Sequence, residues 1–254
     1  MQKKKLIVLL ILSLLMFVTL SSVAYAAPGV SISDGGITIQ NSDDPEEISA
    51  SIKLLLILTI LALLPSILIM MTSFVRIVIV LSFMRNSMGT QQIPPNQVII
   101  GLALFLTFFI MRPVLTDINE NALQPFTENR ITLEEATDRA ETSMKEYMLK
   151  YTRDKDLALF AGIAKTEAPE KLTDLPLTVV TPAFMISELN TAFRMGFMLY
   201  IPFVVIDMVV ASTLMSMGMM MLPPVMISMP FKILLFILVD GWNLLTETII
   251  KSFA

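Results

Sequence analysis

The chain has 254 residues, of which 55% are hydrophobic and 16% charged, and its mean hydropathy is +0.74. This composition excludes an ordinary soluble domain and indicates a protein of the membrane or of a membrane-derived assembly. The sequence has no His and no Cys, which excludes imidazole acid–base chemistry, thiol nucleophiles and disulfides, and the net charge of −4 gives no reason to expect a nucleic-acid partner.

The first 50 residues read as a targeting segment and a lead-in. Residues 1–26 combine three lysines at 3–5, an apolar run and Ala24-Tyr25-Ala26, a pattern typical of a cleaved signal peptide; an uncleaved first membrane helix is the alternative. Residues 27–50 contain Gly35-Gly36 and an acidic stretch, and they predict a flexible, non-cytoplasmic lead-in.

Residues 51–112 predict a first apolar helical hairpin. The run Leu54–Val75 has 22 residues without a charge, is interrupted by Pro65, and ends at Arg76. An arginine at the centre of a lone spanning helix costs roughly 2.5–3.5 kcal/mol, so we expect Arg76 to have a partner or a polar environment. The later run Val98–Met111 is short for an independent span.

Residues 113–180 predict a polar helical insert on the periplasmic side. Thr132 and Glu135 have the spacing of a capping box, and the apolar residues that follow recur at helical spacing, which predicts a helix of about five turns. The charges read most simply as a solvated surface. The region shows neither a Gly-rich phosphate loop nor a nucleophile paired with a base, so we expect no catalytic residues and expect that the protein is not an enzyme.

Residues 181–254 predict a second apolar hairpin. Thr181 as cap and Pro182 as first helical residue form a good helix start, and Pro202 is expected to kink the helix. Between Asp207 and Lys232 lie 24 uncharged residues that include eight Met. Gly218 and the pair Pro223-Pro224 interrupt this stretch, which therefore predicts two helical arms joined by a bend lined with methionine.

Three successive methionines at the bend, Met219, Met220 and Met221, cannot all face one core from a helix, but a bend lets them project together. Several copies around an axis would form a soft apolar collar. Core packing is the alternative, and we favour it for the helical methionines Met195, Met198, Met208 and Met215. A metal site is the other alternative, which the lack of His and Cys disfavours, so no metal and no cofactor are expected.

A short internal repeat links the two hairpins. Residues 87–95 read SMGTQQIPP and residues 216–224 read SMGMMMLPP, with six of nine positions identical or exchanged between Ile and Leu. We infer two helix–bend–helix hairpins of common plan, with chance as the alternative. The repeated bend residues are Gly89, Pro94 and Pro95 in the first copy and Gly218, Pro223 and Pro224 in the second. The centres differ in polarity, so different roles are expected.

Charges interrupt the apolar runs at Arg76, Asp207, Lys232 and Asp240. Such charges usually face the interior of a bundle or a watery path, so we expect them to pair within the chain or across subunits. Asp207 and Lys232, on opposite arms of the second hairpin, are the leading candidates, and if they pair, exchanging the two charges should partly restore function. A simple hydropathy count gives four membrane segments after the signal, with the polar region outside.

Three long motifs carry a resemblance to a known family. They are PAFMISELNTAFRMGF at 182–197, IPFVVIDMVVASTLMSMGMMMLPP at 201–224 and PFKILLFILVDGW at 230–242. They closely resemble the FliP family of flagellar biosynthesis proteins, which has relatives in virulence type III secretion. The similarity extends to residues 72–114 and is weakest over 27–50 and 127–175.

The resemblance implies an all-α, membrane-associated subunit of the flagellar export gate. Copies would form a pentamer, a ring-like helical oligomer, with FliQ-like and FliR-like subunits and other export-apparatus membrane proteins, and unfolded flagellar proteins would pass through its centre. The place implied is the bacterial inner membrane at the flagellum basal body, largely on the periplasmic side, where the hairpins need not span the bilayer.

The resemblance also implies roles for individual residues. Met219, Met220 and Met221 would form the channel gasket, Asp207 and Lys232 align with charges that matter for export, and Glu188 aligns with an intersubunit polar contact. We group Arg76 and Asp240 with these charges as intersubunit or gating candidates. The alternative function is a secondary transporter or ion channel for a small solute, with Asp207 and Lys232 as its relay.

Overall fold

A computed structural model describes residues 29–33, 36–40, 45–90, 92–165, 171–219 and 221–253. The predicted signal peptide (1–26) and Met220 lie outside the described residues. The chain divides into two units, Met1–Pro65 and Ser66–Ala254, and each is described by itself.

The first unit contains a two-stranded antiparallel hairpin and most of one helix. Strand β1 (Gly29–Ser33) pairs with β2 (Gly36–Gln40), with Val30 opposite Ile39. Helix α2 (Pro45–Met70) follows, with Pro65 inside it. The lead-in predicted as flexible thus holds regular structure where it is described.

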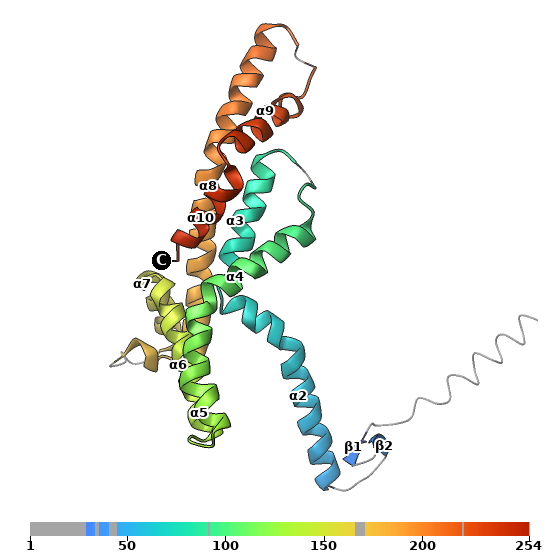
Figure 1. Ribbon diagram of the computed structural model, residues 1–254, viewed down its shortest axis with the longest axis vertical. Helices are drawn as coiled ribbons and strands as arrows, with labels where there is room; N and C mark the ends of the chain where they lie inside the picture. The colour runs from blue at the N-terminus through green and yellow to red at the C-terminus, as the bar shows by residue number, and fades with distance from the viewer. Residues whose placement is uncertain are drawn as a thin grey trace, which may run out of the picture. The chain divides into compact units, whose positions relative to one another are not determined.

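The second unit is helical throughout its regular structure in the described residues (Figure 1). Its two hairpins, α3–α4 and α8–α9, have their bends at their upper ends in Figure 1, and the helices α5–α7 of the polar insert lie lower. The elements are α3 (Phe74–Ser87), α4 (Asn96–Ile118), a π-helical turn η2 (Asn119–Leu123), α5 (Gln124–Thr127), α6 (Leu133–Tyr151), α7 (Asp154–Ala164), a 3-10 turn η3 (Leu172–Asp174), α8 (Leu177–Ser216), α9 (Pro224–Leu238) and α10 (Gly241–Lys251).

Packing of α3 along α8 joins the two hairpins. Gly196 of α8 makes this close approach possible, because a Cβ atom there would lie 2.5 Å from the ring of Phe83. One face of α3 is buried at helical spacing, and it forms the main core together with residues of α4, α8, α9 and α10. The most buried members of that core are Ile77, Val80, Leu81, Met84, Ala103, Ala192, Leu245 and Ile249.

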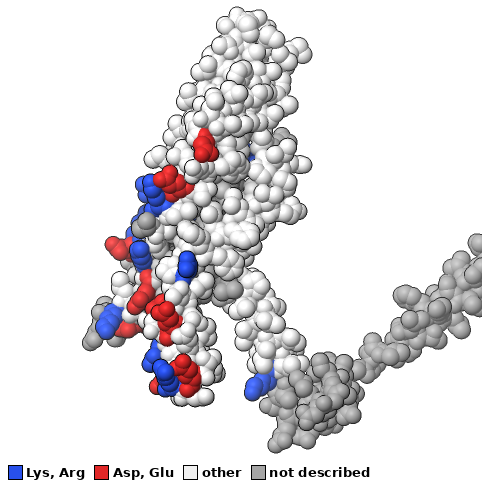
Figure 2. Space-filling view, in the orientation of Figure 1, with Lys and Arg blue, Asp and Glu red and all other residues white. Residues whose placement is uncertain are grey.

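The insert packs against the first half of α8 through a second core, in which Met148, Val180 and Phe184 are fully buried. The predicted capping box is confirmed, because Glu135 N donates to Thr132 Oγ1 (3.2 Å) and Thr132 N donates to Glu135 Oε2 (3.1 Å). The predicted five-turn helix is α6, of 19 residues. The charged side chains visible in Figure 2 gather over this insert, and the surface above it is nearly bare of charge.

One sequence prediction about a helix limit is wrong. Helix α8 begins at Leu177 rather than after Thr181, because the Pro176 carbonyl already accepts from Val179 N (2.9 Å) and Val180 N (3.1 Å). Pro202 lies inside α8, and the kink expected there stays a prediction. Helix α4 passes through the expected domain limit at residue 112 without a break.

The count of four membrane segments is also too high. Two described helical stretches are long and apolar enough to cross a membrane, Asn96–Thr127 and Leu177–Ser216. A third is possible if α9 and α10, bent by 67° at their junction, form one broken span. The difference arises because the apolar run Leu54–Val75 lies mostly in α2, whose apolar stretch Ile52–Ile67 is shorter than a span, and only Phe74 and Val75 of the run belong to α3.

Candidate functional site: two bends and the charges beneath them

The two repeated bends are built in the same way. Helices α3 and α8 end at the equivalent residues Ser87 and Ser216, and the glycines two residues later, Gly89 and Gly218, have φ of +77° and +75°. Glycine adopts this left-handed conformation without the steric cost that a Cβ atom brings. The structure therefore confirms two helix–bend–helix hairpins of one plan.

The next helix starts at the proline pair in both bends, with a shift of one residue. Pro95, the second proline of the first pair, is the N-cap of α4, whereas Pro224, its equivalent, is already the first residue of α9 after the N-cap Pro223. A proline fits these positions because the first backbone N–H groups of a helix have no partner within it.

The first bend is braced by side-chain hydrogen bonds. Arg85 Nη1, in the last turn of α3, donates to Asn96 Oδ1 (2.5 Å) and to the Pro94 carbonyl (3.3 Å) across the bend. Thr90 Oγ1 donates to the Ile93 carbonyl (2.6 Å). The arginine thus connects the end of α3 with the start of α4, and the bend between them is held at both ends.

The second bend exposes thioethers instead. Met219 is 43% exposed and Met221 is 97% exposed, and neither lies in a helix. Side chains of this kind supply no hydrogen-bond donor, so the described part of this bend lacks the cross-bracing of the first. The side chains of Met219 and Met221 are therefore accessible to contacts from outside the chain.

The expected core packing of the helical methionines is correct only for Met195, which packs against the main core. Met198, Met208 and Met215 are 71%, 66% and 63% exposed. They lie on surfaces of α8 that no other described part of this chain covers, which is why the prediction fails in the single chain.

Lys232 lies at the point where α3, α8 and α9 meet. Its Nζ donates to Asp207 Oδ2 (2.6 Å) and to the Ser87 carbonyl (3.2 Å), and Ser228 Oγ donates to the other Asp207 oxygen. The side chain of Lys232 is 3% exposed and that of Asp207 24%. The structure therefore brings together the pair that the sequence singled out.

The two serines of this cluster were not found from the sequence. Ser87 is the last residue of α3, and its carbonyl belongs to the group that has no partner within a helix and bears the negative end of the helix dipole. Lys232 satisfies it with a charge of the favourable sign. Two signals were available: Ser87 opens the repeated motif, and Ser228 lies one helical turn before Lys232.

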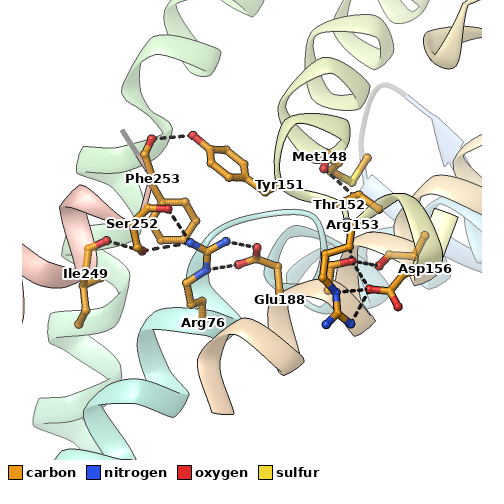
Figure 3. A network of polar contacts seen from close by, with 12 residues as sticks. Arg76, Met148, Tyr151, Thr152, Arg153, Asp156, Glu188, Ile249, Ser252 and Phe253 are labelled. Atoms are coloured by element: carbon orange, nitrogen blue, oxygen red, sulfur yellow. Dashed lines mark hydrogen bonds and ion pairs between the residues drawn. The ribbon is translucent and has the colours of Figure 1, made fainter. Parts of the chain in front are cut away.

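Arg76 and Glu188 form a second, deeper charge pair (Figure 3). Arg76 Nε donates to Glu188 Oε2 (2.8 Å), Arg76 Nη2 bonds the other carboxylate oxygen, and the side chains are 3% and 0% exposed. The expectation that Arg76 has a partner is confirmed. The intersubunit contact of Glu188 stays a prediction, and in this chain the carboxylate is already enclosed and bonded.

The end of α10 covers this pair. Arg76 Nη1 donates to the Ser252 carbonyl (2.8 Å) and to Ser252 Oγ (3.0 Å), and its Cζ lies 3.8 Å from the ring centre of Phe253 (Figure 3). Tyr151 OH of α6 donates to the Phe253 carbonyl (2.6 Å). A buried ion pair is stable only when its remaining hydrogen-bonding groups are satisfied, and here Ser252, directly after α10, accepts from the third guanidinium nitrogen.

A third polar contact attaches α7 to α8. Ser187 Oγ donates to Asp156 Oδ2 (2.6 Å), as does Arg153 Nε (2.6 Å), and Arg153 N donates to Ser187 Oγ (3.0 Å). Burial tends to raise the pKa of Asp156, but the hydrogen bonds from Ser187 and Arg153 outweigh it and lower the pKa. No sequence motif pointed to this contact.

Asp240, the last of the predicted charges, lies at the break between α9 and α10. It is the N-cap residue of α10, with φ of +49°, and it accepts a hydrogen bond from Asn243 Nδ2 (3.2 Å). Its side chain is on the surface, unlike those of Arg76 and Lys232.

Comparison with known proteins gives a consistent result over most of the chain. The FliP family model matches residues 57–249. The flagellar biosynthetic protein FliP of Bacillus subtilis is 63% identical over 217 residues, which are 85% of this chain and 98% of that protein. The proteins of the same name from Aquifex aeolicus and Pectobacterium carotovorum are 54% and 51% identical, over 80% of this chain and 86% and 79% of their own lengths.

Proposed function

Because this chain belongs to the FliP family of flagellar biosynthetic proteins, we propose that it is a structural subunit of the flagellar type III export gate. Copies of the chain surround a channel for unfolded flagellar proteins, and the methionine bend of each copy contributes to a collar that closes it. The observation that carries this proposal is the exposed, unbraced bend at Met219 and Met221, built on the same plan as a braced bend that lacks methionine at its centre.

The exposed apolar surface supports an assembly of several subunits. Helix α8 is long and apolar enough to cross a membrane, and only 11% of its apolar stretch is buried inside the chain. On α4, the side chains of Phe105, Phe108 and Phe109 are 78%, 65% and 62% exposed. Contiguous apolar surface of this kind marks contact with lipid or with protein. We assign it to other copies of this chain, arranged as a pentamer, to FliQ-like and FliR-like subunits, and to the inner membrane at the periplasmic side of the basal body.

The alternative, a small-solute transporter with Asp207 and Lys232 as a relay, has no specific support in the geometry. A relay requires that its charge exchange partners with solvent or solute, whereas the Lys232 ammonium is buried and bonded to a carboxylate and a helix end. The chain contributes instead a buried ion pair that connects α8 with α9.

The test is a measurement of ion leakage through the closed assembly. Replacing Met219, Met220 and Met221 by Gly in the gate purified with its partner subunits should make it conduct small ions in a planar bilayer. The matched control is Met208→Ala, which trims a methionine of similar exposure on the side of α8 and should leave the closed gate tight. An unchanged conductance in the triple variant would contradict the collar.

A further inference from the structure

Helix α9, which follows the methionine bend, is attached to the rest of the chain by one narrow stripe. Of its 15 residues only Ser228, Lys232 and Phe236 are buried, and they are spaced four residues apart on one face. Two of the three attachments are polar, through Asp207 and the Ser87 carbonyl. A helix held in this way buries little apolar surface, so moving it costs less than moving α3, whose whole inner face is in the core.

The first turns of α9 lie against the first bend. A Cβ atom built on Gly89 would be 3.8 Å from Val225 Cγ1 and 3.9 Å from Met229 Cβ, which is ordinary van der Waals contact. Two residues earlier, the Ser87 carbonyl receives the Lys232 ammonium. The first bend therefore lies beside Val225 and Met229 of α9, and the end of α3 before it accepts a hydrogen bond from Lys232. Arg85 keeps this bend in place.

The far end of α9 is a sharp break. The axes of α9 and α10 differ by 67°, and Asp240 at the junction has φ of +49°, which the helix cannot continue. Gly241 next to it is required by close packing, because a Cβ atom there would lie 2.1 Å from the Phe236 ring. The break therefore has a fixed position, and α10 beyond it is anchored in the core through Leu245 and Ile249.

From these contacts we propose that α9 and the methionine bend form a lever that turns about the break at Val239–Asp240, and that the first bend is the seat that sets the closed position of this lever. The proposal rests on the channel function proposed above and assigns the movable part. The braced bend stays still because Arg85 connects its two ends. The methionine bend moves because the polar stripe of α9 can leave Ser87 and Asp207 for water or for a neighbouring subunit.

A disulfide between the seat and the lever tests this directly. Gly89→Cys with Met229→Cys places two thiols on Cβ positions 3.9 Å apart, within the range of about 3.5–4.5 Å that a disulfide requires. The natural sequence contains no other Cys, so any bond formed within the chain joins these two. In the assembled gate, oxidation should produce the bond, stop export of flagellar subunits and keep the bilayer tight to ions, and a reductant should restore export.

The control pair is Gly101→Cys with Met229→Cys, because nothing lies within 4 Å of a Cβ atom at Gly101 and no bond should form. If the Gly89 pair does not cross-link, or if it cross-links fully and export continues, the lever is refuted. In either case the collar remains tested separately by the leak of the triple glycine variant, so the two proposals fail independently.

A second variant covers the case in which Cys at Gly89 prevents folding, since the positive φ there disfavours any side chain. Arg85→Ala removes the brace and leaves both helices intact, so the seat should loosen and the closed gate should leak ions. Arg130→Ala, which removes an exposed arginine of the insert, is its control and should remain tight. A tight Arg85→Ala gate would overturn the role of the first bend.

Discussion

Exchanging the charges of Asp207 and Lys232 tests the cluster beneath the bends most sharply. From the sequence alone, the exchange of a simple ion pair is expected to restore part of what each single substitution loses. The structure gives the opposite expectation, because Lys232 also donates to the Ser87 carbonyl at the end of α3. A carboxylate in its place would face a carbonyl oxygen and the negative end of a helix dipole.

The magnitudes follow from burial and bonding. Asp207→Ala leaves a lysine that is 3% exposed without its counter-charge, a loss of about 3–5 kcal/mol in a fully buried site and nearer 3 here, because Asp207 is 24% exposed. The neutral pair Asp207→Asn with Lys232→Met removes both charges and leaves mainly one carbonyl without a donor, at a cost of about 1–3 kcal/mol. The exchanged pair retains two charges in the wrong places and should cost about 3–5 kcal/mol.

The assay is denaturant unfolding of the detergent-solubilised chain, from which the free energy of unfolding of each variant is obtained. The exposed pair Lys251→Met with Glu247→Gln serves as control and should change it by less than about 0.5 kcal/mol. An exchanged pair that is as stable as the neutral pair would show that the Ser87 carbonyl does not contribute, and the reasoning would fail.

Three further outcomes are expected. Arg76→Met leaves Glu188 buried without its cation and should lower the free energy of unfolding by about 3–5 kcal/mol. Adding Glu188→Leu should recover part of this loss in a double-mutant cycle, and an equal loss in the single and the double variant would contradict the pairing. Because folding lowers the pKa of Asp156, its charge stabilises the fold above the unfolded pKa of about 3.9, and this stabilisation is lost as the pH falls through the folded pKa. The difference in free energy of unfolding between the wild type and Asp156→Asn should therefore shrink in an acid titration. Thr132→Ala removes the cap of α6 and should cost about 1 kcal/mol by thermal unfolding, whereas Thr127→Ala, whose hydroxyl bonds only its own helix, should cost less; equal effects would remove the capping argument.

The features that the sequence predicted correctly are those with a local cause. Gly89 and Gly218 interrupt the apolar helices through their own backbone conformation, and the capping box at Thr132 depends only on residues of the same helical turn. The pairing of Asp207 with Lys232 could be predicted because a short bend brings α8 and α9 together.

Features that depend on distant contacts were missed. The Ser252 carbonyl on Arg76 joins residues 176 positions apart, and no pattern in the sequence connects them. The start of α8 was misplaced because Pro176 and Pro182 offer competing helix starts and only packing against the insert decides between them. The exposure of Met198, Met208 and Met215 could not be foreseen, since an apolar helix that the single chain leaves exposed has the same composition as one buried in its core.

Trp242, the sole tryptophan in the sequence, stands edge-on to Phe236 with ring centres 5.3 Å apart, directly beside the break between α9 and α10. Indole emission responds to the polarity and contacts of its surroundings, so the chain carries an intrinsic fluorophore at its own pivot. Any rotation of α9 relative to α10 changes that stacking. The motion can therefore be followed by spectroscopy without attaching a dye.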